Sequence, residues 1–208
     1  LVTVATLIFV TPFFFVIYTS LRDTKDIILN GFVAPIKEFH LENYKNAFFD
    51  GNLMQASLNS LAITIPALLL MMFLSSAAAF AFARLRFRGN KIFFLFVLLS
   101  MYIPTAVKLI PIYRLYSDLG LTNSIAGLVV LQTAMCIPFC VFVLRNFFLT
   151  IPKELQEAAI IDGCSYASIY YKIYMPLSKP SLAVLVILQF TTVWNSFLWE
   201  LLLMPGNT

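Results

Sequence analysis

Five hydrophobic segments, each long enough to cross a lipid bilayer, constrain this sequence more than any other feature. A hydrocarbon core of about 30 Å needs roughly 20 apolar residues for one crossing. Charged residues make up only 12% of the 208 residues and hydrophobic ones 61%, whereas soluble domains carry about 25% charged residues. The sequence therefore predicts an all-α fold, a polytopic membrane helix bundle, with spans at about residues 1–19, 61–83, 92–112, 125–144 and 182–203.

Both ends of the sequence are expected to continue into a longer chain. The first span starts at Leu1 without a methionine or the basic region that opens a signal peptide. The last span meets Pro205 and Gly206, and the sequence ends there soon afterwards. We therefore treat the chain as one membrane domain, residues 1–208, that is clipped at both ends.

The charge distribution predicts the orientation of the spans. The stretch RLRFRGNK holds Arg84, Arg86, Arg88 and Lys91 without an acid, and a short basic loop between two spans marks the cytoplasmic side. Residues 20–56 balance four cations against five acids, which suits an outer loop containing short helices. The basic residues thus indicate membrane topology and not nucleic-acid binding.

The number of crossings places one further segment on the cytoplasmic side. Two expected spans, 92–112 and 125–144, separate the basic loop from the charged stretch at 153–172. An even number of crossings returns a chain to the same side of the membrane. The segment 148–180 is therefore expected to be cytoplasmic.

Residues 148–180 predict a helix–turn–helix. Pro152 suits the first turn of a helix, where its missing N–H has no cost. The helix should cover residues 153–161 and end where Gly163 adopts a left-handed conformation. Ser165 can cap a second helix that runs to about residue 172.

Pro176 and Pro180 are expected to stop that second helix before the last span. Helices this short are marginal alone in water, so they need the bundle, a partner protein or lipid headgroups as a packing surface. The residues alone do not choose between these surfaces. The first helix offers small residues that a partner's groove could accept, namely Ala158, Ala159 and Gly163.

Prolines and polar residues mark the spans themselves. Pro66, Pro104, Pro111 and Pro138 predict kinks in spans two, three and four, which occur in moving and in static helices alike. In the last span, a polar stripe at helical spacing predicts a lined cavity, although Glu200 could instead reach the outer interface. The stripe consists of Gln189, Thr192, Ser196 and Glu200.

The residues argue against a catalytic role. Three thiols, Cys136, Cys140 and Cys164, with the distant His40 make no metal-ligand set, and we expect the thiols to serve as small packing residues. No phosphate-binding G-x-x-x-x-G-K-[S/T] loop occurs. The chain therefore cannot hold nucleotide phosphates through such a loop.

The stretch EAAIIDGCSYASIYYKIYMPLSKP resembles the EAA motif of membrane subunits of binding-protein-dependent ABC importers. Cys164 and Met175 replace the usual alanine and leucine. LENYKNAF, AAAFAFARLRFRGNK, RNFFLTIPKELQEAA and WNSFLWE fall in the order of the carbohydrate-type permeases, similar to the second maltose-type permease subunit. That family has six spans, so a sixth is expected after residue 208, and the sequence is expected to be truncated at its C-terminus.

The resemblance implies a mechanism and a set of partners. This chain would form a heterodimer with a second permease subunit, and two ATP-binding subunits would complete the transporter in the cytoplasmic (inner) membrane of a prokaryote. ATP and Mg would bind to the ATP-binding subunits, and this chain would bind no cofactor. An extracytoplasmic binding protein would deliver a sugar. The coupling residues implied are Glu157, Ala158, Ala159, Asp162 and Gly163, and the candidate translocation path is Gln189, Thr192, Trp194, Asn195, Ser196 and Glu200.

Two other classes of protein stay open at this point. An ion-gradient-driven secondary transporter of a small polar solute should show several acids within its spans and often an internal repeat, but only Glu200 qualifies. An intramembrane enzyme should show a buried histidine, aspartate or serine–lysine set. The solute itself could be a sugar, an oligosaccharide or a compound resembling glycerol phosphate.

Overall fold

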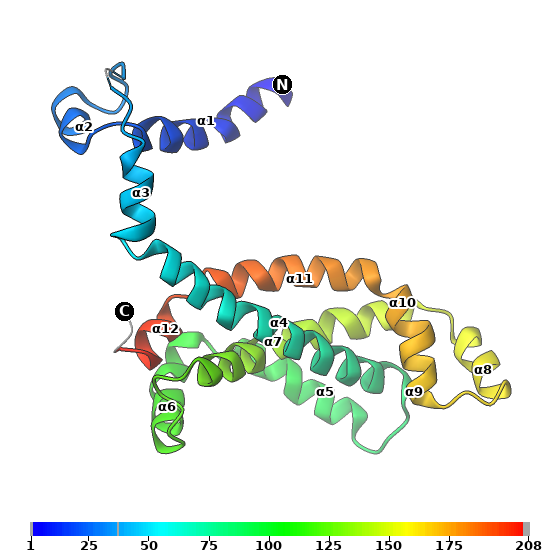
Figure 1. Ribbon diagram of the computed structural model, residues 1–208. Helices are drawn as coiled ribbons and strands as arrows, with labels where there is room; N and C mark the ends of the chain where they lie inside the picture. Colours follow the sequence, from blue (N-terminus) through cyan, green and yellow to red (C-terminus); the bar gives the residue numbers. More distant parts are fainter. Residues whose placement is uncertain (1, 37, 206–208) are drawn as a thin grey trace. The chain divides into compact units, whose positions relative to one another are not determined.

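The structure, a computed structural model, describes residues 2–36 and 38–205 and contains helices but no strands within them. It divides into two compact units, Leu1–Asn59 and Ser60–Thr208. The helices appear in Figure 1 with these bounds: α1 (Val2–Ser20), α2 (Thr24–Asn30), α3 (Glu42–Phe49), α4 (Leu53–Arg84), α5 (Asn90–Leu99), η1 (Ser100–Tyr102), α6 (Thr105–Asp118), α7 (Ile125–Thr150), α8 (Lys153–Ile161), α9 (Tyr166–Ile169), η2 (Tyr170–Tyr174), α10 (Met175–Leu177), α11 (Lys179–Trp194) and α12 (Leu198–Leu203).

The first unit contains α1 and, in the segment at residues 20–56, the short helices α2 and α3. Short helices were expected there, and the outer position of this segment stays a prediction. Among the residues of this unit that the structure describes, the most buried polar one is Arg22, which is 2% exposed. The Arg22 guanidinium pairs with Asp26 at 2.5 Å and donates to the carbonyls of Gly31 and Phe32. Because a buried charge needs a partner, these contacts hold the loop against Arg22, two residues after the end of α1.

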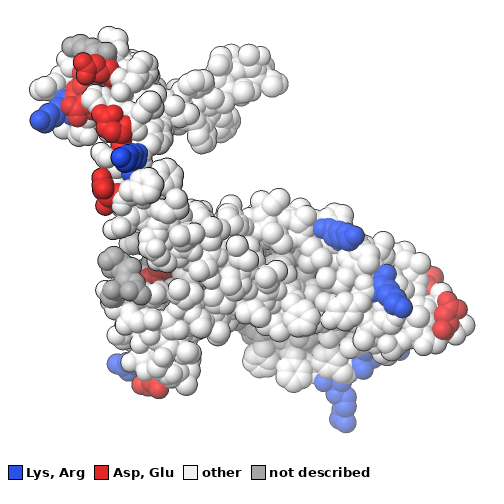
Figure 2. All heavy atoms as spheres, viewed as in Figure 1, with Lys and Arg blue, Asp and Glu red and all other residues white. Residues whose placement is uncertain are grey.

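The second unit is a bundle built around α4 and α7. Ser75, Ser76 and Ala79 on α4 are fully buried, and small residues let helix backbones approach closely in lipid. Figure 2 shows the charged side chains of this unit gathered near its two ends, with an uncharged surface between them. That distribution fits a chain whose middle lies in hydrocarbon.

Three of the described helices, α1, α4 and α7, are each long and apolar enough to cross a membrane alone. Two bent pairs would raise the number to five if each pair counts as one span. One pair joins Asn90–Tyr102 to Thr105–Asp118 at 104°, and the other joins Tyr166–Leu177 to Lys179–Trp194 at 73°. The expected third span, 92–112, is therefore not one straight helix.

Of the four prolines expected to kink a span, only Pro104 ends a helix. Ile103 before it is extended, with ψ of 116°, because a residue that precedes proline is disfavoured in the helical region. Pro66, Pro111 and Pro138 all lie inside continuous helices.

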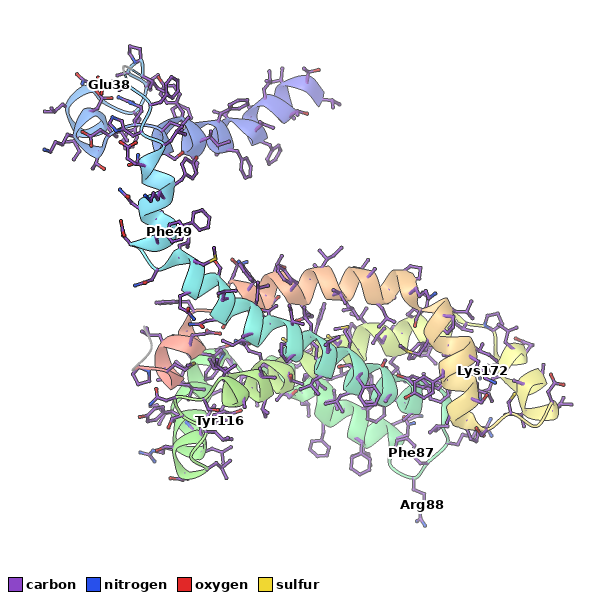
Figure 3. All side chains as sticks on the ribbon, viewed as in Figure 1. Glu38, Phe49, Phe87, Arg88, Tyr116 and Lys172 are labelled. Atoms are coloured by element: carbon purple, nitrogen blue, oxygen red, sulfur yellow. The ribbon has the colours of Figure 1, made fainter. Side chains whose placement is uncertain are left out.

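The basic loop and α8 lie at the same end of the second unit (Figure 1), as the even number of crossings predicts. Figure 3 shows Arg88 at the tip of the loop, pointing away from the bundle. Cys136 and Cys140 are buried inside α7, in agreement with a packing role.

Candidate functional site

The first helix of the predicted helix–turn–helix is confirmed with the expected bounds. α8 runs Lys153–Ile161, and Gly163 follows with a φ of +78°. The N–H of Gly163 donates to the carbonyl of Ile160 at 3.0 Å, and that of Cys164 to Ala159 at 2.9 Å. This pair of bonds is a Schellman motif, which requires a left-handed residue and favours glycine.

The second helix differs from the prediction after its start. Ser165 caps α9 as expected, accepting a bond from the backbone N–H three residues on at 3.3 Å. Pro176 does not stop the helix. A π-helical turn, η2, precedes it and helical turns continue to Leu177, because a wider turn accommodates a proline that lacks an N–H and crowds the carbonyl of Lys172. The chain bends instead at Ser178, and Pro180 lies in the first turn of α11.

Exposure along α8 corrects the proposed small-residue face. Ala159 is only 8% exposed and belongs to the hydrophobic core of the bundle, whereas Ala158 is exposed. Leu155 is 45% exposed and Ile161 is 85% exposed. The face available to another protein therefore carries Ala158 with two large aliphatic residues, and Ala159 anchors the helix.

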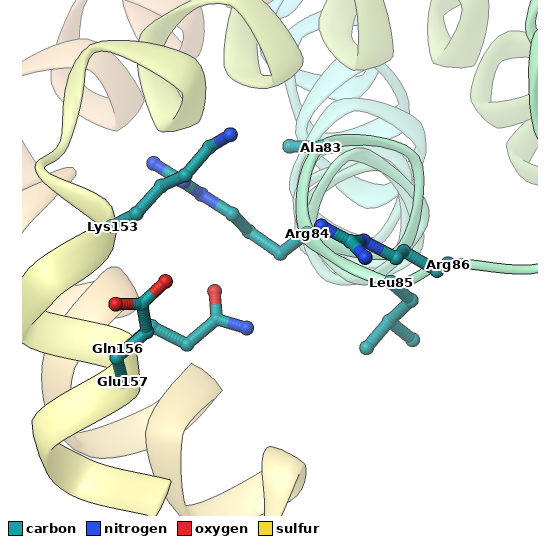
Figure 4. Close-up of a pocket in the computed structure, with 7 residues that line it drawn as sticks. All are labelled: Ala83, Arg84, Leu85, Arg86, Lys153, Gln156 and Glu157. Atoms are coloured by element: carbon teal, nitrogen blue, oxygen red, sulfur yellow. The ribbon is translucent and has the colours of Figure 1, made fainter.

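Arg84, the last residue of α4, joins that helix to the start of the helix–turn–helix (Figure 4). Its side chain is 9% exposed. Nη2 donates to the carbonyl of Phe148 at 2.5 Å and to the carbonyl of Ile151, and the guanidinium lies 5.2 Å from the centroid of the Tyr174 ring. Carbonyls at a helix C-terminus carry partial negative charge, so the end of α7 attracts this cation.

Aromatic packing extends the same junction. The ring of Phe80 on α4 contacts those of Phe148 and Tyr174, with centroids 6.4 and 5.0 Å away. The Tyr174 hydroxyl donates to Gln156 of α8 at 3.2 Å. The charged, aromatic and hydrogen-bonded contacts together connect α8 mechanically to α4 and α7.

A large cavity of about 1150 Å³ opens between α6, α7 and α11. Four of the six residues of the candidate translocation path line it, namely Gln189, Thr192, Asn195 and Ser196. Gln189 is only 5% exposed. An otherwise buried carboxamide at the wall of such a cavity can donate to and accept from a polar solute.

Trp194 and Glu200 are not among the residues that line the cavity. Trp194 stacks on Phe190 at 5.4 Å. α11 ends at Trp194 and α12 begins at Leu198, so the expectation of one continuous helical stripe is wrong.

Glu200 takes part in a hydrogen-bonded group behind the cavity wall. Ser196 Oγ donates to Glu200 Oε2 at 2.8 Å, and Gln132 Nε2 donates to Glu200 Oε1 at 3.0 Å. The same Gln132 nitrogen also donates to Ser196 Oγ at 2.7 Å. Both carboxylate oxygens are therefore held by neighbouring side chains.

Sequence reasoning missed Gln132 and Lys108, which also line the cavity. Gln132 is a lone carboxamide within an apolar span, and that alone could have marked it. Lys108 lies beyond the bend at Pro104, and only the folded path of α6 brings it to the cavity.

Comparison with known proteins identifies the family. Residues 71–208 match the model of the binding-protein-dependent transport system inner membrane component. The chain belongs to this family. The resemblance inferred from the EAA motif is thereby confirmed, as is the expectation of a non-catalytic permease subunit.

Several similar proteins are named as permeases of uptake or transport systems. An osmoprotective compounds uptake permease protein of Synechocystis sp. is 35% identical over 91% of this chain and 65% of its own length. A diacetylchitobiose uptake system permease protein of Streptomyces coelicolor is 31% identical over 92% and 63%. An arabinooligosaccharides transport system permease protein of Halalkalibacterium halodurans is 35% identical over 95% and 71%. The chain thus spans slightly less than two thirds of the first two relatives.

A solved structure confirms the all-α membrane fold. The crystal structure of a bacterial ABC transporter involved in the import of the acidic polysaccharide alginate matches with a TM-score of 0.86. The match covers 98% of this chain and 71% of that chain at 24% sequence identity.

Proposed function

We propose that this chain is a permease subunit of an ATP-driven importer that moves a sugar or related solute across the cytoplasmic membrane of a prokaryote. The observation that carries the proposal is α8, a short helix with an exposed aliphatic face and a rigid link to the spans through Arg84. Such a helix suits docking to a separate ATP-binding subunit, which would hold ATP and Mg. The names of two relatives, for arabinooligosaccharides and diacetylchitobiose, support a carbohydrate as the solute.

The assembly follows from the same proposal. A second permease subunit would form a heterodimer with this chain and complete the pathway. An extracytoplasmic binding protein would deliver the solute. ATP-driven closure of the ATPase pair would pull on α8 and the coupling residues Glu157 to Gly163. The cavity beside Gln189 and Ser196 would then alternate between the two sides of the membrane.

Cysteine crosslinking tests the docking step. In a Cys164→Ser background, Ile161→Cys should crosslink to the co-expressed ATP-binding subunit, because Ile161 is 85% exposed. Ala159→Cys, on the same helix but 8% exposed, is the matched control and should not react. Absence of crosslinking at Ile161 with linkers of several lengths would contradict the proposed coupling role.

Transport in proteoliposomes tests the pathway and its energy source. Gln189→Leu combined with Ser196→Leu should slow solute uptake without preventing assembly, because both side chains line the cavity. Uptake should stop on ATP depletion and persist when ion gradients are dissipated. The opposite pattern would support the secondary-transporter alternative.

A further inference from the structure

A second, smaller cavity lies between the end of α4 and the start of α8. Its volume is about 160 Å³. Figure 4 shows that Arg84 and Arg86 reach it from α4 and the basic loop, while Lys153, Gln156 and Glu157 reach it from α8. The cavity belongs entirely to this chain, so conclusions about it do not depend on the proposed function.

The charges around this cavity do not balance. Arg84, Arg86 and Lys153 contribute three positive charges and Glu157 one negative charge, which leaves a net charge of +2. Within residues 2–36 and 38–205, no ion pair joins any of these four side chains to another. Three cations around one small space repel one another, and the single Glu157 carboxylate offsets only one of the three charges.

Arg84 makes the imbalance more costly, because its side chain is 9% exposed. Nη2 bonds the two carbonyls of the junction, while Nε and Nη1 have no hydrogen-bond partner in the described part of the chain. A buried cation is normally accompanied by a counter-charge. The groups that contact the Arg84 guanidinium are backbone carbonyl dipoles and the Tyr174 ring, and neither carries a full negative charge.

Residues of the first turn of α8 line the same cavity. α8 has nine residues, and Lys153 and Gln156 of its first turn line the space. The first four backbone N–H groups of a helix lack intrahelical partners and carry partial positive charge. Phosphate groups bind at helix N-termini for this reason.

We propose that this cavity binds the phosphate group of an anionic ligand. Arg86 and Lys153 are both exposed and stand on different elements, so together they can hold a phosphate between the basic loop and α8. Arginine matches phosphate geometry well and lysine binds it as a point charge. The phosphate would belong to an acidic phospholipid headgroup or to a soluble phosphate compound, and in both cases would tie the basic loop to α8.

Binding measurements on the full chain, purified in a neutral detergent, test this site. The probes are short-chain phosphatidylglycerol, inorganic phosphate and, as a phosphate-containing lipid without net charge, short-chain phosphatidylcholine. Arg86→Gln with Lys153→Gln should weaken binding about thirtyfold, since each basic side chain near a membrane surface contributes about 1 kcal/mol and 1.4 kcal/mol is a tenfold change.

Two further variants make the test specific. Arg88→Gln with Lys91→Gln also removes two positive charges, both from the basic stretch at residues 84–91, but neither residue lines the cavity, so affinity should change little. Glu157→Gln removes the carboxylate of the cavity and should strengthen binding. A variant that strengthens binding cannot be explained by misfolding.

The probes also distinguish the two sources of phosphate. Binding of phosphatidylglycerol alone would assign the site to a lipid headgroup, and binding of inorganic phosphate would assign it to a soluble compound. The proposal is overturned if neither probe binds, if phosphatidylcholine binds as well as phosphatidylglycerol, if both double variants lose affinity equally, or if Glu157→Gln weakens binding.

Discussion

Replacing Arg84 with methionine should loosen α8 from the bundle while leaving the spans folded. Methionine retains much of the apolar packing of the arginine stem but cannot donate a hydrogen bond. The carbonyls of Phe148 and Ile151, at the junction between α7 and α8, lose the donor that Arg84 supplies. These two hydrogen bonds join elements more than sixty residues apart in sequence.

The size of the effect follows from those two carbonyls. A buried acceptor left without its partner costs about 1–3 kcal/mol. The Phe148 carbonyl also accepts from the N–H of Ile151 at 3.3 Å, so it is not fully deprived, and removing a buried cation returns part of its desolvation cost. We therefore expect the junction to lose about 2 kcal/mol, or about thirtyfold in its opening equilibrium.

Hydrogen–deuterium exchange measures this opening directly. In the purified chain, peptides covering α8 should exchange about thirtyfold faster in Arg84→Met than in the wild type. Arg88→Met is the matched control, because Arg88 lies on the same loop and points away from the bundle (Figure 3). Equal exchange of α8 in the two variants would show that the buried arginine does not hold the helix.

Substitutions at Gly163, Gln132 and Glu42 test the remaining features. Gly163→Ala should lower solute-stimulated ATP hydrolysis severalfold in the assembled complex, because φ is +78° at this residue. Gly163→Pro should abolish hydrolysis, because proline also removes the N–H that bonds the carbonyl of Ile160. The control Gly120→Ala should leave hydrolysis unchanged, although φ is +66° there and an added Cβ likewise meets no atom within 4 Å. Gln132→Leu should reduce the initial rate of uptake about tenfold by removing a donor to a carboxylate, and wild-type uptake would exclude the hydrogen-bonded group from the pathway. The hydrogen bond with Glu42 raises the pKa of His40 above its ordinary 6.5, so an NMR titration of Glu42→Gln should show a lower His40 pKa, and an unchanged pKa would contradict the assignment. The pair stabilises the fold fully between the ordinary pKa of Glu42, 4.5, and that of His40, 6.5. The stabilisation disappears as pH rises through the folded-state pKa of His40 or falls through that of Glu42.

Features set by neighbouring residues were predictable from the sequence. α8 has the predicted bounds because Pro152 and Gly163 fix its ends through their own backbone preferences. Ser165 caps α9 for a similar reason. The position of the basic loop and α8 at one end of the bundle followed from the number of hydrophobic segments between them.

Predictions that treated a helix as regular were less successful. The stripe of polar residues in the last span assumed one helix, but the break after Trp194 redirects Ser196 and Glu200 toward Gln132. Pro176 was expected to end a helix, and a π turn absorbs it instead. Both outcomes depend on neighbouring helices, which local preference does not describe.

Hydropathy and backbone preference act over one or a few turns, so they were enough to predict a helical membrane protein with a short helix at residues 153–161. Packing between distant residues was needed to bury Ala159 while exposing Ile161, to join α4 to α7 through Arg84, and to bring three cations around one small cavity. Each of these depends on how residues distant in sequence pack together. Burial and charge pairing arise from that packing, so a one-dimensional pattern leaves them undetermined.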